Sequence, residues 1–250
     1  MTQIATLPFR PQAVIFDMDG LMLDSERAIT ACLAQAAADQ GLQIEPAFWL
    51  RMVGTDDVAC RLLLGERIGD AAAETMLVHA QQLYAAVVER GIPHRPGIIA
   101  LLEYLAAQGM PRAVATSTQR PLALRKLEAA DLLWRFDAVC TASDVVHPKP
   151  APDIYLLAAR TLAVDPTHCL VLEDSPIGVR AALAAGMTPI QIPDLLEPDA
   201  AVRALGHRIL PSLSDAQRLL KVLVGLMRLA MLSIGAAMLL AGFQSRRRYR

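Results

Sequence analysis

Short apolar runs recur along the chain, and stretches with helical periodicity lie between them. The runs are partly β-branched or aromatic, and polar or glycine-bearing residues follow each one, which is typical of buried strands. They lie at residues 13–16, 112–115, 136–140, 169–172 and 189–192. The helical patterns lie at residues 98–108, 122–130, 153–162 and 177–185. This alternation predicts an α/β fold with a doubly wound parallel sheet, in which ligands bind beyond the carboxyl ends of the strands.

One long interval breaks the alternation after the first strand. Residues 25–92 contain no convincing strand, and their apolar positions follow helical stripes such as Ile29, Cys32, Leu33 and Ala36. We therefore expect an inserted α-helical cap at residues 25–92. The core domain would then consist of residues 1–24 and 93–215.

The composition narrows the class of protein. Hydrophobic residues make up 54% of the chain and charged residues 20%, so the chain can bury a core. Aromatic residues make up only 4%, which argues against a base-stacking surface, and we expect no nucleic-acid partner. The four cysteines show no C-x-x-C spacing, and the N-terminus has no apolar segment of signal-peptide length. These features indicate free thiols in a cytoplasmic protein.

The last part of the chain differs from the rest. Residues 216–250 carry seven basic residues and no acidic one, and residues 219–243 are strongly apolar. The uncharged stretch at residues 229–244 has 16 residues, fewer than the ~20 that span a bilayer core. The segment could be a core or oligomer helix, a membrane helix, or sequence from a shifted reading frame. We expect membrane contact or self-association through residues 219–250.

Two carboxylates, Asp17 and Asp19, follow the first strand directly and precede Gly20. Unpaired like charges about 4 Å apart repel by about 4 kcal/mol at an effective dielectric constant near 20. A hard divalent cation with oxygen ligands would neutralise them. The alternative is a tight turn in which the aspartates cap the backbone and the glycine supplies a positive φ.

Further polar side chains follow other strands of the predicted sheet. Thr116 and Ser117 follow the second strand, and Glu173 and Asp174 follow the strand at residues 169–172. Lys149 lies between two prolines, which restrict its backbone, just before a helix. Taken singly, these residues fit helix caps and a solvated loop charge. Together at neighbouring strand ends, they indicate a site for a metal ion and a phosphate group.

Four ordered stretches resemble the motifs of the haloacid dehalogenase-like superfamily, in its helical-cap branch of β-phosphoglucomutase-like phosphatases and mutases. They read FDMDGLMLDSE, VATST, HPKPAPDIY and VLEDSPIGVRAALAAGM. The resemblance implies a Rossmann-like core in which Asp17 is the nucleophile and Asp19 the general acid and base. It implies that Thr116 and Lys149 hold the transferred phosphoryl group.

The same resemblance implies a magnesium site and a substrate site. The Mg²⁺ ligands would come from Asp17, the backbone carbonyl of Asp19, Asp174 and, directly or through water, Glu173. The positions that would bind substrate or phosphate are Gly20, Ser25, Gly54, Thr116, Ser117 and Lys149.

The resemblance favours a phosphatase that hydrolyses a small phosphorylated metabolite through an aspartyl-phosphate. Asp19 argues against a dehalogenase, which lacks a leaving-group acid there. Related sugar-phosphate mutases carry a histidine at the position of Ile29, and a lysine and an arginine around the cap glycine. Here those two positions around Gly54 are Val53 and Asp57, and Asp57 would repel a second phosphate. A mutase, or a non-catalytic membrane-bound or partner-binding relic, remains the alternative.

Overall fold

A computed structural model of the chain describes residue 9, residues 11–52 and residues 57–223. It has a six-stranded parallel sheet in the order β3-β2-β1-β4-β5-β6. The strands are β1 (Ala13–Phe16), β2 (Arg112–Thr116), β3 (Ala138–Thr141), β4 (Cys169–Glu173), β5 (Thr188–Gln191) and β6 (Arg208–Ile209). The predicted fold class is confirmed, and the first five strands begin and end within two residues of the predicted positions. β6 was not predicted because two residues are too short to show a period.

Helices cover both faces of the sheet. They are α5 (Ile98–Ala107), α6 (Arg120–Ala129), α7 (Asp153–Thr161), α8 (Pro176–Ala184) and the short α9 (Ala200–Arg203), with 3₁₀ turns η1 (Leu133–Arg135), η2 (Ala142–Asp144) and η3 (Pro166–His168). Alternate side chains of β1 enter two different cores: Val14 and Phe16 pack with α5 and α6, whereas Ala13 and Ile15 pack with α7 and α8. All four are fully buried, as expected for a strand inside a doubly covered parallel sheet.

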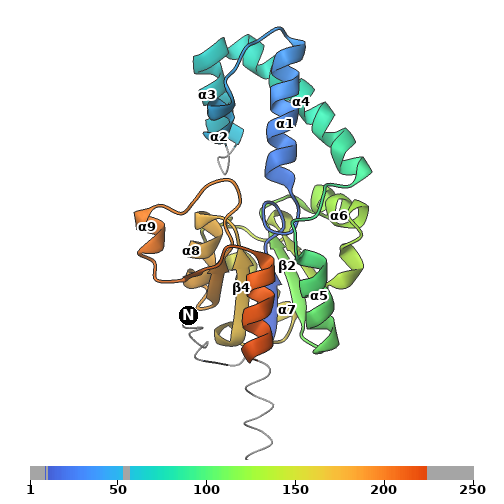
Figure 1. Cartoon of the computed structure of the whole chain (residues 1–250), viewed down its shortest axis with the longest axis vertical. Coiled ribbons are helices and arrows are strands. Elements are labelled where there is room, and N and C mark those ends of the chain that lie inside the picture. Colours follow the sequence, from blue (N-terminus) through green and yellow to red (C-terminus); the bar gives the residue numbers. More distant parts are fainter. Residues whose placement is uncertain (1–8, 10, 53–56, 224–250) are drawn as a thin grey trace, which may run out of the picture.

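The segment between β1 and α5 forms a group of helices beyond the carboxyl ends of the strands (Figure 1). It contains α1 (Ser25–Asp39), α2 (Pro46–Leu50), α3 (Asp57–Ile68) and α4 (Asp70–Arg90), and we call residues 25–92 the helical lobe. The lobe has its own apolar core, which includes Leu33, Trp49, Leu64 and Met76. Every described helix of the lobe thus lies within the range expected for the cap.

The two connections between the lobe and the sheet run side by side. Leu23 and His94 form an isolated antiparallel bridge. On either side of it, the Asp24 N–H donates to the Pro93 carbonyl at 2.8 Å, and the Arg95 N–H donates to the Met22 carbonyl at 2.8 Å. The lobe therefore begins and ends at nearly the same place.

A final helix at residues 213–223 packs on the core. Leu213, Ala216, Leu219, Leu220 and Leu223 are buried in the same apolar cluster as α5. The expected division at residue 215 therefore falls inside a helix, and residues 216–223 belong with the core rather than with a separate tail. The rest of the segment expected to contact a membrane or another copy, residues 224–250, lies outside the described residues. In the part of the chain that the structure describes, no helix is both long and apolar enough to cross a bilayer.

Truncation after Leu213 is expected to destabilise the protein, whereas truncation after Leu223 leaves this packing intact. The shorter chain loses three buried leucines, each contributing about 1.5–3 kcal/mol through burial, so the free energy of unfolding should fall by roughly 5 kcal/mol or more. Urea unfolding of the two truncated proteins measures the difference. Equal unfolding midpoints would show that the helix adds no stability to the core.

Candidate active site

Three adjacent strands bring the predicted site residues together. β2, β1 and β4 are neighbours in the sheet, and Phe16 of β1 pairs with Val114 of β2 and with Leu172 of β4. Their carboxyl ends therefore meet at one edge of the sheet. A cavity of about 490 Å³ opens there, and its inner end is lined by Asp17, Asp19, Thr116, Ser117, Lys149 and Asp174. The structure thus collects six of the predicted residues around one cavity.

Lys149 is the centre of the polar contacts. Its ammonium donates to Asp17 Oδ1 at 2.6 Å, to Glu173 Oε1 at 2.7 Å and to the Ala115 carbonyl at 2.9 Å. Burial alone would lower the pKa of Lys149, but the carboxylates of Asp17 and Glu173 raise it well above its usual value. Burial raises the pKa of Asp17 to about 7, with Lys149 opposing the shift and Glu173 adding to it. One ammonium therefore fixes two buried acids.

Glu173 is fully buried, and protein donors occupy both of its oxygens. Oε1 accepts from Lys149 and from the Tyr155 hydroxyl at 2.6 Å, while Oε2 accepts from the Ser175 N–H at 3.1 Å and its hydroxyl at 3.0 Å. Tyr155 was not singled out from the sequence, because it occupies an apolar position of α7. The lysine, the tyrosine and the serine together hold this carboxylate in a single orientation.

Two glycines make room for the acids. A Cβ atom on Gly178 would lie 1.7 Å from Glu173 Oε1. A Cβ atom on Gly20 would lie 2.3 Å from Asp174 Oδ2, and Gly20 also has a φ of +81°. No side chain fits either position without moving a carboxylate, so both glycines are needed for this packing.

Asp17, Glu173 and Asp174 form the one acidic cluster among the described residues with the spacing of a metal site. Each offers a carboxylate oxygen, and these oxygens lie within 4.8 Å of one another. Burial raises the pKa of Asp174 well above its usual value, and repulsion from Glu173 and Asp17 raises it further. A hard divalent cation would relieve this repulsion, and carboxylate oxygens are the ligands that Mg²⁺ prefers. The donor set therefore fits Mg²⁺.

Asp19 turns to a different set of partners. Its Oδ1 accepts from the Lys126 ammonium at 2.8 Å, and its Oδ2 accepts from the Thr118 hydroxyl at 2.7 Å. Burial would raise the pKa of Asp19, but the charge and hydrogen bond of Lys126 and the hydrogen bond of Thr118 lower it overall. Sequence reasoning missed Lys126. The available signal was its place beside Ala123 and Leu127 on the buried face of α6, where an unpaired lysine is rare.

The remaining predicted substrate positions lie away from the cavity or outside the described residues. Ser25 is fully buried at the start of α1, where its hydroxyl accepts from the Gly20 N–H at 3.1 Å. The structure thus places Ser25 and Gly20 in the turn that supports Asp17 and Asp19, and neither lines the cavity. Gly54 lies outside the described residues.

The outer end of the cavity is apolar and acidic. Sequence reasoning did not identify this wall, which comes largely from the loop between β5 and α9 and includes Ile177, Asp194, Leu195, Leu196, Pro198 and Val202. Glu26 of α1 joins it, and burial together with the charge of Asp19 raises the pKa of Glu26 to about 7. Lys149 is the only basic side chain among the residues that line the described cavity.

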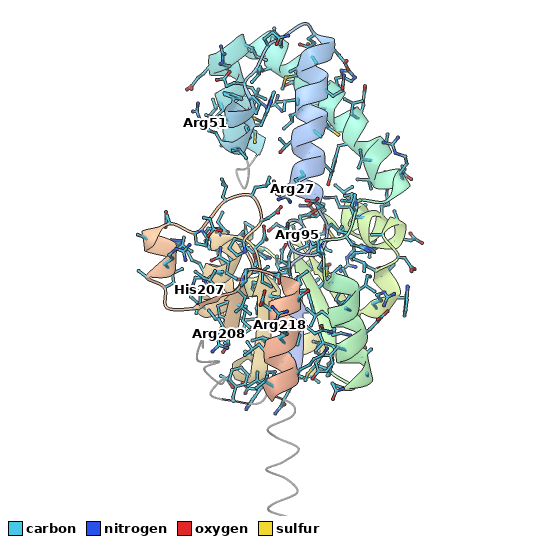
Figure 2. The ribbon with its side chains drawn as sticks, viewed as in Figure 1. Arg27, Arg51, Arg95, His207, Arg208 and Arg218 are labelled. Atoms are coloured by element: carbon cyan, nitrogen blue, oxygen red, sulfur yellow. The ribbon has the colours of Figure 1, made fainter. Side chains whose placement is uncertain are left out.

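Two arginines approach this wall from the base of the lobe. Figure 2 shows Arg27 and Arg95 near the junction between the lobe and the sheet. Asp194 binds both, with its Oδ1 accepting from Arg27 Nη1 at 2.6 Å and from Arg95 Nη1 at 2.5 Å. Arg27 also pairs with Asp24 at 2.7 Å. Acidic partners therefore already neutralise the cations nearest to the outer cavity.

Comparisons with known proteins agree with this geometry. A family model described as haloacid dehalogenase-like hydrolase matches residues 11–186. Hexitol phosphatase A of Escherichia coli K12 is 34% identical over 206 residues, which cover 78% of this chain and 92% of that protein. The (DL)-glycerol-3-phosphatase 1 of Arabidopsis thaliana is 34% identical over 211 residues, which cover 81% of this chain and 70% of that protein.

Solved structures also resemble this one. The putative β-phosphoglucomutase from Thermotoga maritima superimposes with a TM-score of 0.73 at 29% identity, covering 86% of this chain and 99% of that one. A HAD family hydrolase from Deinococcus radiodurans R1, solved with bound phosphate and sodium, superimposes with a TM-score of 0.71 at 28% identity. The match covers 82% of this chain and 93% of that one.

Proposed function

Because the chain belongs to the haloacid dehalogenase-like hydrolases, we propose that it is a Mg²⁺-dependent phosphatase acting on a small sugar phosphate or polyol phosphate through an aspartyl-phosphate intermediate. The observation that carries the proposal is the contact between Lys149 and Asp17, beside three clustered carboxylates and at the inner end of a cavity. Such an arrangement presents a carboxylate oxygen to a phosphorus atom and compensates the charge on the phosphoryl oxygens.

In the first step, an oxygen of Asp17 bonds to phosphorus while the bond from phosphorus to the ester oxygen breaks. Asp19, once it has taken up a proton, gives that proton to the departing oxygen, and Lys149 and Thr116 hold the phosphoryl oxygens. In the second step, Asp19 takes a proton from water as the water attacks the aspartyl-phosphate, which releases phosphate and restores Asp17. Asp17, Asp174 and the Asp19 carbonyl would hold Mg²⁺, which when bound neutralises charge at the phosphoryl group.

The outer cavity supports an uncharged leaving group. Ile177, Leu195 and Leu196 offer apolar contacts, while Glu26 and Asp194 are acidic. A second phosphate or a carboxylate on the substrate would meet no basic lining residue there apart from Lys149, which already serves the phosphoryl end. Hydroxyl-bearing carbon chains therefore suit the described cavity better than bisphosphates do.

The mutase alternative has less support from the residues that the structure describes. The position at which the mutase relatives carry a histidine is Ile29, which packs against the apolar core of the lobe. A mutase would also need to retain a bisphosphate within an acidic outer cavity. A hydrolase that releases inorganic phosphate therefore agrees better with this lining.

Assays of the purified chain on a panel of phosphate esters test the proposal. With Mg²⁺, we expect inorganic phosphate to be released from hexitol, hexose or glycerol phosphates. EDTA should lower the rate by about 100-fold or more, because a metal ion contributes several kcal/mol of charge stabilisation, and added Mg²⁺ should restore it. An isomeric sugar phosphate without phosphate release would identify a mutase. No turnover of any ester, with or without Mg²⁺, would overturn the proposal.

A further inference from the structure

Lys126 is a buried cation that the proposed reaction does not use directly. It lies on α6 between apolar neighbours, and its side chain is 4% exposed. Its ammonium donates to Asp19 Oδ1 at 2.8 Å, yet Lys126 does not line the cavity, so its contact is with Asp19 and not with the phosphoryl site. A buried lysine costs free energy unless it is paired, and Asp19 supplies that pairing here.

A residue of the helical lobe packs against the side of the Lys126 ammonium that faces away from Asp19. The Lys126 ammonium lies 5.1 Å from the ring centre of Tyr84, which belongs to α4 of the lobe. α4 packs against α6, and the two helices meet at the junction between lobe and sheet (Figure 1). Lys126 therefore lies between an aromatic face of the lobe and the carboxylate of Asp19.

Both carboxylate oxygens of Asp19 accept hydrogen bonds from α6 or from the turn that precedes it. Thr118, in the turn that leads into α6, donates to Oδ2, and Lys126 of α6 donates to Oδ1. With both oxygens bonded, the plane of the carboxylate is defined by α6 and the turn before it. Loss of Lys126 would leave Oδ1 without its donor, so Asp19 could rotate about its side-chain bonds.

We propose that Lys126 is a positioning residue that orients Asp19 for proton transfer, and that the Tyr84 ring holds Lys126 in place from the helical lobe. This inference rests on the proposed function and adds a residue to it. Lys149 and Thr116 hold the phosphoryl group independently of Lys126, so substrate binding should survive its loss while proton transfer slows. Misplacing a proton-transfer group by about 1 Å is enough to lower a rate by about 100-fold.

The test compares two leaving groups in Lys126→Met. An alkyl phosphate needs a proton on its departing oxygen. 4-Nitrophenyl phosphate releases 4-nitrophenolate, a stable anion that needs this proton far less. We expect kcat for the best alkyl phosphate of the panel to fall about 30–100-fold with KM changed less than about 3-fold. The loss of kcat/KM, which reports the first step, should be at least about fivefold smaller for 4-nitrophenyl phosphate. Lys126→Arg, which keeps a charged donor, should recover most of the rate.

Arg125→Met is the matched control. Arg125 directly precedes Lys126 on α6 and pairs with Glu89 of α4, so it also links the two helices, but it does not contact Asp19. Its loss should leave both substrates within about twofold of the wild-type rate. Tyr84→Leu, which removes the ring from Lys126, should show the pattern of Lys126→Met more weakly.

Several outcomes would overturn the inference while leaving the proposed function in place. They are an unchanged kcat in Lys126→Met, equal losses on both leaving groups, or the same losses in Arg125→Met. If Lys126→Met does not fold by circular dichroism, Lys126→Gln, whose amide donor is uncharged and one atom shorter, should show a smaller loss with the same difference between the two leaving groups. A wild-type chain that turns over none of the esters would instead overturn the proposed function.

Discussion

Replacing Asp17 with asparagine is expected to lower phosphate release by about 10⁴-fold or more while the protein stays folded. The amide has nearly the shape of the carboxylate but lacks the nucleophilic oxygen, and loss of a nucleophile removes most of an enzyme's rate enhancement. Lys149 keeps its contacts with Glu173 and Ala115, so the packing around it should survive the change.

The measurement combines steady-state assays with acid quenching on a ³²P-labelled substrate. Wild-type protein should carry acid-stable, alkali-labile label, and Asp17→Asn should carry none. Asp24→Asn, seven residues further on and paired with Arg27 outside the cavity, is the control and should stay within about threefold of the wild-type rate. Normal turnover or normal labelling of a folded Asp17→Asn protein would exclude Asp17 as the nucleophile.

Replacing Lys149 with methionine should cost both activity and stability. The change leaves the buried carboxylates of Asp17 and Glu173 without their shared cation, and such a loss typically lowers the free energy of unfolding by about 3–5 kcal/mol. The phosphoryl group also loses its compensating charge, so kcat/KM should fall by at least about 10³-fold.

The stability loss in Lys149→Met should also depend on pH in a defined direction. The pKa of Asp17 is already raised from its usual value of 3.8 to about 7. The folded state therefore binds more protons than the unfolded state between these values, and stability falls as pH rises through them. Without Lys149 this pKa rises further, and the loss should extend above pH 7. Urea unfolding in EDTA should therefore show a smaller deficit at pH 5 than at pH 8. A deficit that does not change with pH would mean that the carboxylates stay paired without the lysine.

The strand ends could be predicted because parallel strands obey a simple geometric rule. Asp17, Thr116 and Glu173 each follow or end an apolar run, and runs of one parallel sheet place their carboxyl ends at one edge. The cluster of Asp17, Glu173 and Asp174 could therefore be predicted from the order of the strands along the chain. The glycine at position 20 could likewise be expected, because a turn directly after a strand needs a positive φ.

Lys126 and Tyr155 were not predicted because their partners lie far away in sequence. Lys126 contacts a residue 107 positions earlier, and Tyr155 contacts one 18 positions later. Each occupies an apolar position of an otherwise regular helix. The hydrophobic periodicity of a helix predicts which face is buried, but it does not predict which residue a buried polar group contacts. Residues 216–223 were assigned to a tail for a related reason: the apolar stretch that continues beyond residue 223 concealed where packing on the core ends.

The pairing of Leu23 with His94 also bears on how such a protein can change over time. Because the chain leaves and re-enters the sheet at nearly one point, the intervening segment can lengthen, shorten or be exchanged with little effect on the closure of the surrounding fold. The hydrogen bonds that join Lys149 to Asp17 and Glu173 involve no side chain of α2 or α3. α2 and α3 could therefore diverge while the acidic cluster is kept, whereas α1 and α4 are more constrained, because Glu26 lines the cavity and Tyr84 lies against Lys126.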